Sequence, residues 1–397
     1  MAGRPAEPEK LGYLDALRGW AILLVVLSHA AQGQFAVDAL VQGAPQGRVL
    51  ALPDWLVRVF AYEGSCVYLF FVVSAISLTL SWRARGETNW RDYFIRRFFR
   101  VAPMFYTGVA LYIALFGWGP RLYAPAGIGP GDVVLTLGFL HIWSTEALNS
   151  VVPGDWSIGA EAMFYLILPL VLTFGRTPLR LALLTAGFVL IAQIVHWGNA
   201  PFGPFGNAGF PSQAAVFLFG VCAARYAAAA RFARTENLGL SPAGDAAGTR
   251  IAVACRQCAA LLLFLFLFLG LPFAHLPEQI VVYHVQFAAG AALLCTLLHR
   301  LPMPILVNPP LVWLGQISFS MYVLHFALFA PIFAAAQHVA AGAGDLALLG
   351  IYYVLLVAAA AACAALAHEA IERPGMRLGR RIVARLQGRR LALESAR

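Results

Sequence analysis

The sequence has few charged side chains and almost no lysine. Only 12% of its 397 residues are charged, whereas 60% are hydrophobic, and the mean hydropathy is +0.74. Soluble domains carry about 25% charged residues, so this composition excludes a chain built mainly of soluble domains. It predicts a polytopic integral membrane protein.

Cysteine and metal-ligand patterns are also missing. Most of the six cysteines lie within hydrophobic runs, and the CRQC stretch at 255–258 has no second pair or nearby histidine to complete a metal or redox site. We therefore expect no disulfide and no bound metal. The net charge of +9 comes without a recognised nucleic-acid motif or a stacking platform, so no nucleic-acid partner is expected.

Long hydrophobic runs occupy most of the chain. A helix needs roughly 20 apolar residues to cross a bilayer, and the runs near that length lie at 13–32, 60–82, 101–118, 157–175, 179–197, 210–230, 252–272, 279–299, 311–336 and 346–371. The fold class is thus all-α, with about ten transmembrane helices in one domain over 1–376. The shorter run 132–143 predicts a re-entrant or surface helix. The polar start, MAGRPAEPEK, is unlike a signal peptide, so the first helix is expected to be retained.

The basic residues divide unevenly between the loops. If ten helices cross the membrane with both termini in the cytoplasm, all but three of the 28 basic residues lie on the cytoplasmic side, the exceptions being Arg48, Arg58 and Arg121. The positive-inside rule predicts such a division. We expect cytoplasmic termini and a basic cytoplasmic tail over 377–397, folded as a helix on anionic headgroups.

The first predicted helix carries Arg18 near its start and His29 near its end. Eleven residues make three helical turns plus about 20°, so both side chains face the same way, about 16 Å apart. A snorkelling anchor and a headgroup-level histidine would explain them singly, but ionisable groups within spans are usually functional. Glu161 and His325 lie at a similar predicted depth in two other spans. A carboxylate beside a histidine suits general-base catalysis and equally a proton relay.

A cluster of arginines precedes the third span in RRFFRVAPMFY, which contains Arg96, Arg97 and Arg100. Arg97 and Arg100 share a helix face and could bind phosphates, although positive-inside anchoring explains them as well. Near the end of the chain, HEAIERP contains Glu372, which we expect to pair with one of these arginines.

Taken together, these motifs resemble the integral-membrane acyltransferases of the acyltransferase-3 type, which O-acylate bacterial glycans, lipopolysaccharide, nodulation factors and some macrolides. Arg18 and His29 match the arginine–ten residues–histidine signature of that family's first helix. YLFFVVSAISLTL is similar to its serine–glycine stretch, with Ala75 in place of the usual glycine. IRRFFRVAPMFY resembles its arginine-rich motif, and DWSIGAEAMFYLILPL its Trp-Ser-x-x-x-Glu segment, with Ala162 where a second acid is common. ISFSMYVLHF and IERP match two late landmarks.

The resemblance implies a membrane O-acyltransferase that passes an acyl group, typically acetyl, from cytoplasmic acetyl-CoA to a hydroxyl presented outside. Acyl-CoA is then a co-substrate, and no cofactor is bound permanently. The implied catalytic residues are His29, Glu161 and Arg18; the implied donor-binding residues are Arg97, Arg100 and Arg96; and the implied substrate contacts are His325, Tyr322, Trp156 and Ser74. His29 would deprotonate the acceptor hydroxyl with Glu161 orienting it, or would carry the acyl group covalently.

The implied partners are acyl-CoA, the lipid bilayer and a glycan or lipid-linked saccharide, in the cytoplasmic membrane of a bacterium. Some family members add a secreted hydrolase-like domain, and nothing in this sequence resembles one. A lipid-linked oligosaccharide, an exopolysaccharide repeat or a small lipophilic acceptor is therefore favoured. The alternative is a proton-coupled transporter or exporter with an intramembrane His–Glu relay, although no inverted repeat is visible. An inactive family member that assists assembly is a third interpretation.

Overall fold

The computed structural model describes residues 11–31, 50–61, 64–85, 89–121, 123–197, 209–237, 246–274, 280–299, 301 and 303–395. Over these ranges the chain is helical, and its only β-type pairing is an isolated bridge between Arg121 and Ala124. The all-α prediction is confirmed.

Nine helical segments of the described chain are long and apolar enough to cross a membrane. A further helix, α9, has a shorter apolar part, and together they match the ten predicted runs one for one. The helices are α1 (Gly12–Ala31), α4 (Gly64–Ala84), α5 (Trp90–Phe116), α7 (Trp156–Phe174), α8 (Pro178–Trp197), α9 (Phe210–Asn237), α10 (Ala246–Leu265) with η3 (Phe266–Gly270) and η4 (Leu271–Phe273), α11 (Ile280–Leu298), α12 (Pro309–Leu324) with η6 (His325–Leu328) and α13 (Phe329–Val339), and α14 (Asp345–Ala367) with η7 (His368–Glu372) and α15 (Arg373–Ser395).

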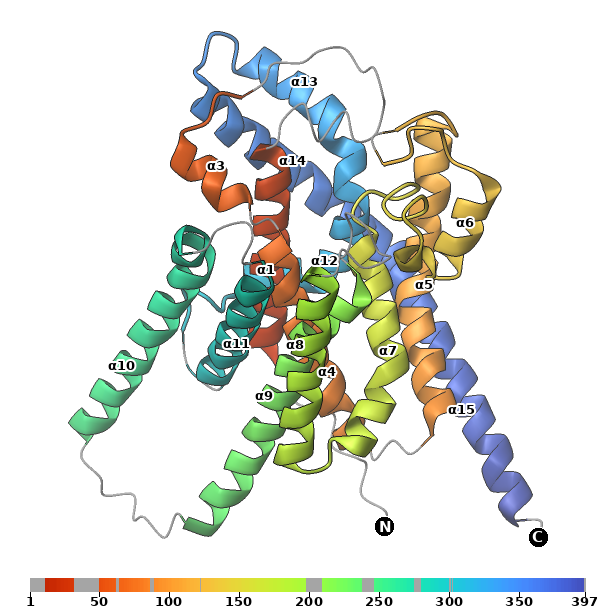
Figure 1. The fold of residues 1–397 in the computed structure, drawn as a ribbon, viewed down its shortest axis with the longest axis vertical. Helices are drawn as coiled ribbons and strands as arrows, with labels where there is room; N and C mark the ends of the chain where they lie inside the picture. The colour runs from red at the N-terminus through yellow and green to blue at the C-terminus, as the bar shows by residue number, and fades with distance from the viewer. Residues whose placement is uncertain are drawn as a thin grey trace.

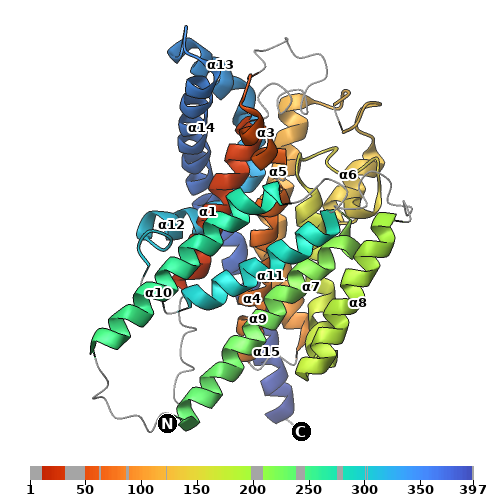
Figure 2. The ribbon, with the colours of Figure 1, turned by 60° about the vertical axis from the view of Figure 1, so that its left-hand side comes forward.

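Helix α1 lies inside the bundle, against α12, α4 and α14 (Figure 2). Its closest neighbour is α12, and two glycines allow the contact. A Cβ on Gly19 would lie 2.2 Å from the carbonyl oxygen of Leu311, and one on Gly315 would lie 1.7 Å from that of Asp15. Small residues allow membrane helices to pack backbone to backbone, so these glycines fix α1, with Arg18 and His29, against α12.

A second close approach joins α4 to α9. A Cβ on Gly220 of α9 would lie 2.5 Å from the carbonyl oxygen of Val72 and 2.8 Å from the Cβ of Ala75. Ala75 stands where the resemblance leads us to expect a glycine. The small residue at this contact is supplied by the partner helix instead, so α4 still packs closely.

The short helices cluster at one end of the molecule. Figure 1 shows α3 (Asp54–Ala61), α6 (Pro130–Leu137) and α13 towards this end, and the C-terminal part of α15 at the other. The predicted surface helix over 132–143 appears as α6 followed by a single 3₁₀ turn, η1 (His141–Trp143). Buried Arg121 holds the adjoining loop by donating to the carbonyls of Val151, at 2.9 Å, and Gly117, at 2.8 Å.

The C-terminal tail is helical, as predicted, but it also packs against the bundle; its contact with headgroups stays a prediction. It continues from α14 through the π-turn η7 and packs along α5. Gly375 and Gly379 face α5, where a Cβ would lie 2.6 Å from Pro103 and 2.7 Å from Phe99 respectively. Glycines four residues apart on one helix face permit this contact. Gln387 adds a 2.8 Å hydrogen bond to Asp92.

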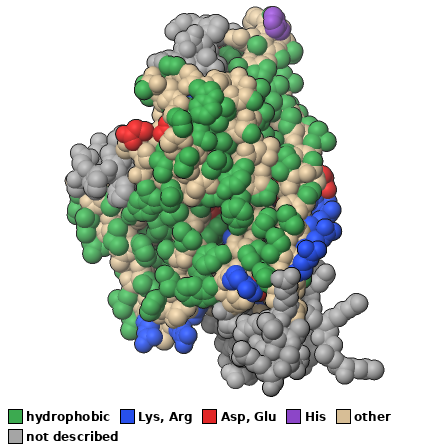
Figure 3. Space-filling model, turned by 90° about the vertical axis from the view of Figure 1, so that its right-hand side faces the viewer, with side chains coloured by type: hydrophobic (Ala, Val, Ile, Leu, Met, Phe, Trp, Pro, Cys, Tyr) green, Lys and Arg blue, Asp and Glu red, His purple; other side chains and the backbone are tan. Residues whose placement is uncertain are grey.

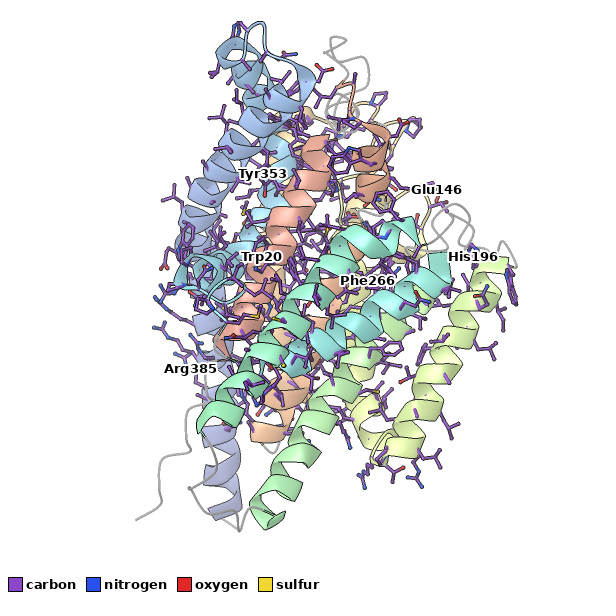
Figure 4. All side chains as sticks on the ribbon, turned by 90° about the vertical axis from the view of Figure 1, so that its left-hand side faces the viewer. Trp20, Glu146, His196, Phe266, Tyr353 and Arg385 are labelled. Carbon is purple, nitrogen blue, oxygen red and sulfur yellow. The ribbon has the colours of Figure 1, made fainter. Side chains whose placement is uncertain are left out.

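The surface divides by polarity along the long axis. On the face drawn in Figure 3 the middle is hydrophobic and basic side chains gather at the lower end. Figure 4 shows Trp20 and Phe266 at mid-height on the bundle, whereas Arg385 of α15 lies lower down. This arrangement matches a multi-pass membrane protein whose apolar belt contacts lipid.

Candidate active site

A cavity of about 170 Å³ lies between α1, α4, α5, α7 and α12. Three of the predicted arginines line it together: Arg18, Arg97 and Arg100. The other lining residues are Val67, Phe70, Phe71, Ser74, Ser77, Leu78, Val101, Ser157, Ile158, Glu161, Tyr165, Ser318, Phe319 and Tyr322. One carboxylate faces three guanidinium groups, so the lining carries a net positive charge.

Two of the three arginines are held by fixed partners. Arg18 donates to Asp15 at 2.7 Å and to Ser77 at 2.8 Å. Arg100 forms an ion pair with buried Glu372, as the sequence predicted, and Glu372 also accepts a 2.7 Å hydrogen bond from Ser320. Such partners fix the direction of each guanidinium group.

Arg97 differs from its two neighbours in the cavity. Among the described residues, no acid forms an ion pair with it, and its Nε lacks a hydrogen-bond partner. Its positive charge is therefore the least compensated of the three. Arg96, which the sequence also placed in this set, is absent from the cavity lining, and its contact with the donor stays a prediction.

Glu161 lies in this cavity and bonds to α4. It accepts a 2.5 Å hydrogen bond from Ser74, and Tyr165 and Arg100 are also near it. The sequence expectation had placed Glu161 beside His29 as its orienting acid. The described contacts do not show that pair. The carboxylate of Glu161 lines the arginine cavity, and the imidazole of His29 bonds to His325.

The cavity lining reaches the depth of His29, but neither His29 nor His325 is part of that lining. On α4 its lining extends from Leu78 to Val67, eleven residues or about 16 Å. Helix α1 lies beside α4, and Arg18 bonds to Ser77 near the lower limit of this lining. His29 follows Arg18 by eleven residues on α1. One end of the cavity therefore lies at the arginines, and the other lies near the depth of the histidine.

Among the described residues, the hydrogen-bond partner of His29 is His325. Its Nδ1 lies 3.0 Å from Nε2 of His325, and the two ring planes differ by only 16° with centroids 5.3 Å apart. This is the geometry of two rings joined edge to edge by one N–H···N hydrogen bond. Phe326 and Phe329 contact the pair, which gives it apolar walls.

The ninth predicted span is broken where it carries His325. Helix α12 ends at Leu324, η6 makes one 3₁₀ turn, and α13 follows. The hydroxyl of Tyr112 from α5 enters the break, where it donates to the carbonyl of Val323 at 3.0 Å and accepts from the amide of Ala327 at 3.1 Å. In an unbroken α-helix these two groups would bond to each other, so the inserted hydroxyl replaces that bond.

Tyr322 connects the cavity to the outer turns. Its hydroxyl accepts from Ser157 at 2.8 Å and donates to the carbonyl of Gly154 at 3.0 Å. Gly154 has a φ of +80°, and a Cβ there would lie 3.1 Å from the tyrosine hydroxyl. The turn before α7 therefore needs glycine to close over Tyr322. Trp156, predicted to touch substrate, lies outside the cavity and packs on Phe71 at 6.0 Å.

A buried acid supports this outer turn. Asp155, fully buried, accepts a hydrogen bond from the amide of Asn149 at 2.8 Å, and its Oδ1 lies 3.7 Å from Nε2 of His141. Burial raises the pKa of Asp155 to about 6, with His141 acting in the opposite direction. This carboxyl thus stabilises the fold best when it is protonated.

Some site residues were outside the sequence prediction. Ser77, Ser157 and Tyr165 line the cavity, and Tyr112 shapes the helix break. Ser77 is three residues after Ser74, on the same helix face, which was an available signal. The others depend on which helices pack together, which no local pattern reveals. Tyr68 bonds to His284 at 2.5 Å and is not part of the cavity lining.

Comparisons with known proteins bear on the family of the chain. A family model described as an acyltransferase domain, of the acyltransferase-3 type, matches residues 11–368. Acyltransferase MdmB of Streptomyces mycarofaciens is 28% identical over 172 residues, a match that covers 42% of this chain and 40% of that protein. The match thus spans less than half of the relative's length. No solved structure matches the chain with significance.

Proposed function

Because the chain belongs to the acyltransferase-3 family, we propose that it transfers an acyl group, acetyl in the first instance, from acyl-CoA to a hydroxyl of a glycan or lipid-linked saccharide. The observation that carries this proposal is the cavity, which has three arginines at one end and rises to the depth of His29. The anionic head of such a donor would lie at the arginines, and its thioester arm would extend towards His29, which is not itself part of the lining.

The arginines would hold the phosphates of the donor. Guanidinium groups bind phosphate through paired, charge-assisted hydrogen bonds, and Arg97 has the least compensated charge of the three. Arg18 and Arg100 are already directed by Asp15 and Glu372. The pantetheine arm would extend past Ser74 and Glu161, whose hydroxyl and carboxylate can bond to its amides.

His29 is the proposed general base. It takes the proton of the acceptor hydroxyl while that oxygen attacks the thioester carbonyl, and the CoA thiolate leaves and is protonated. A covalent route is also open, in which His29 is acylated first and the acceptor then displaces the acyl group. In both routes one acyl–sulfur bond breaks and one acyl–oxygen bond forms.

The arginine-rich end of the molecule would face the cytoplasm, where acyl-CoA is made, and the end with α3 and α13 would face outward. The protein would then lie in the cytoplasmic membrane of a bacterium and modify an exopolysaccharide, lipopolysaccharide or related acceptor. The alternative, a proton-coupled transporter with a His–Glu relay, has less support, because His29 bonds to His325 and Glu161 bonds to Ser74.

The test uses labelled acetyl-CoA. Inverted membrane vesicles containing the full chain receive radiolabelled acetyl-CoA on their cytoplasmic face, and label is followed into glycan and lipid fractions. We expect transfer by the wild type and a loss on the order of 10²–10⁴-fold with His29→Ala. The matched control is His338→Gln, an exposed histidine at the far end of α13.

The outcomes separate three interpretations. Transfer that survives His29→Ala would leave an acyltransferase but remove the proposed base. Label that accumulates on the protein itself would favour the covalent route. No transfer from any acyl-CoA, with the protein inserted and monodisperse, would overturn the proposal and return weight to the transporter.

A further inference from the structure

The hydrogen bonds around His325 have a fixed direction. Its Nδ1 lies 2.7 Å from the carbonyl oxygen of Tyr322, which can only accept. Nδ1 of His325 must therefore carry a hydrogen, and in a neutral ring the lone pair is then on Nε2. That nitrogen lies 3.0 Å from Nδ1 of His29.

The same argument passes to His29. Because Nε2 of His325 accepts, Nδ1 of His29 donates, and the lone pair of a neutral His29 is on Nε2. Unconstrained imidazoles divide between two tautomers, and the partner of one nitrogen decides which form is present. The carbonyl of Tyr322 thus determines, through His325, which nitrogen of His29 acts as the base.

The helix break keeps this carbonyl in place. Tyr112, fully buried, satisfies Val323 and Ala327 on either side of His325. Gly108, one turn earlier on α5, allows the approach, since a Cβ there would lie 2.5 Å from Val323. Without the inserted hydroxyl, the amide of Ala327 would rejoin the carbonyl of Val323, and the 3₁₀ turn at His325 would become regular α-helix.

We propose that His325 is the positioning residue for His29, held by the Tyr112 hydroxyl in the α12–α13 break, and that it fixes the lone pair of His29 on Nε2. This inference rests on the proposed function for its role in catalysis, but the tautomer itself does not. The resemblance implied that His325 contacts substrate and that Glu161 orients His29. In this proposal His325 takes the orienting role instead.

The pair can also share the proton that catalysis delivers. When Nε2 of His29 takes the hydroxyl proton, the hydrogen on Nδ1 can move along the 3.0 Å bond to Nε2 of His325. One proton arrives, one is passed on, and the positive charge spreads over two rings. His325, the neutral partner of His29, thus accepts a proton. A carboxylate in its place would instead stabilise the positive charge on His29 electrostatically.

The direct test reads the tautomer. Protein labelled with ¹⁵N-histidine is studied in bilayers by solid-state NMR, and the His29 signals are identified by their loss in His29→Gln. We expect neutral His29 to carry its hydrogen on Nδ1 in the wild type. With His325→Leu the hydrogen should move largely to Nε2, whereas His325→Gln, whose amide oxygen can accept, should retain the Nδ1 form.

A second variant tests the helix break. Tyr112→Phe removes only the inserted hydroxyl and should convert His29 to a mixture of tautomers. The control is Tyr106→Phe on the same helix, whose hydroxyl bonds to Leu137 and should have no effect. A wild-type His29 that carries its hydrogen on Nε2, or an Nδ1 form that persists in His325→Leu, would overturn the inference.

Activity then distinguishes positioning from packing. His325→Leu should lower kcat by roughly 10²-fold, because a histidine in the wrong tautomer cannot serve as base, while KM for acyl-CoA changes less than about 2-fold. His325→Gln should recover part of kcat. Equal losses in both variants would indicate packing alone. If the wild type transfers no acyl group, the proposed function fails, and the NMR result still decides the tautomer.

Discussion

The arginine cavity and the histidine pair use opposite physical devices at the two ends of one helix. The cavity gathers three guanidinium groups, one carboxylate and several hydroxyls. The pair consists of two imidazoles with aromatic walls, and the contacts described for it within the bundle include no acid. One region can bind charge, whereas the other can move a proton without holding a permanent charge in the membrane.

This difference shows how a membrane protein can separate binding from chemistry. Buried charge is costly unless it is paired, and the cavity meets that cost with Asp15 and Glu372. The histidine pair avoids the cost, because both rings can stay neutral until a proton arrives. Changes at the two regions should therefore affect different measurements.

The largest effect on stability is expected from Glu372→Gln. It leaves Arg100 without its partner, and breaking a buried ion pair costs about 3–5 kcal/mol. Arg100 keeps 30% of its side chain exposed, so the low end, about 3 kcal/mol, is expected. The melting temperature in detergent measures it. The double variant Arg100→Gln with Glu372→Gln should recover most of the loss, and a double variant as unstable as the single one would contradict the pairing.

The next effect depends on pH and concerns the turn near Tyr322. The pKa of Asp155 is raised from 3.8 to about 6 by burial. A raised pKa means that the folded state holds the proton more tightly than the unfolded state, so stability is highest below pH 4 and falls as pH rises through 6. The loss above pH 6 is roughly 3 kcal/mol.

Asp155→Asn tests this pH dependence, because the amide stays neutral while its oxygen can still accept from Asn149. Thermal unfolding between pH 4 and 8 should show a smaller decline in the variant than in the wild type. An unchanged pH profile would mean that the carboxyl stays neutral or titrates elsewhere. His141, which faces the acid, is kept in both proteins.

Arg97→Gln sharpens the comparison between the two regions. Hydrogen bonds to charged groups contribute about 1.5–3 kcal/mol, so KM for acyl-CoA should rise roughly 10- to 100-fold with little change in kcat. Arg96→Gln changes the neighbouring arginine, which lies outside the cavity lining, and should alter KM less than about 3-fold. Equal effects from both variants would indicate a diffuse charge effect and would contradict a specific site at Arg97.

Much of the fold was predictable because lipid imposes length and polarity on each span. Ten apolar runs matched ten helices, and helical spacing alone related Arg18 to His29. The pairing of Glu372 with Arg100 also followed from charge at one end of the bundle. These features depend on one helix or on one rule of burial.

Contacts between helices were harder to predict. Depth placed Glu161, His29 and His325 together, but depth does not reveal which face of a helix meets which neighbour. In the structure the carboxylate of Glu161 bonds to Ser74, and the imidazole of His29 bonds to His325. The break in the ninth span was also hidden, because it requires a hydroxyl from Tyr112, 213 residues before His325. Sequence periodicity carries no information about such an insertion.

The smallest expected effect comes from the contact between α15 and α5, which supports the cavity and not the histidine pair. A Cβ on Gly379 would lie 2.7 Å from that of Phe99, so Gly379→Ala forces the helices apart and costs about 1 kcal/mol. Gly388→Ala, where nothing lies within 4 Å, adds the same methyl group to the same helix and should leave stability unchanged or slightly higher. Because α5 carries Arg97 and Arg100, Gly379→Ala should raise KM for acyl-CoA modestly and leave kcat unaltered. A fall in kcat instead would show that the two regions are coupled through α5, since Tyr112 lies on that same helix.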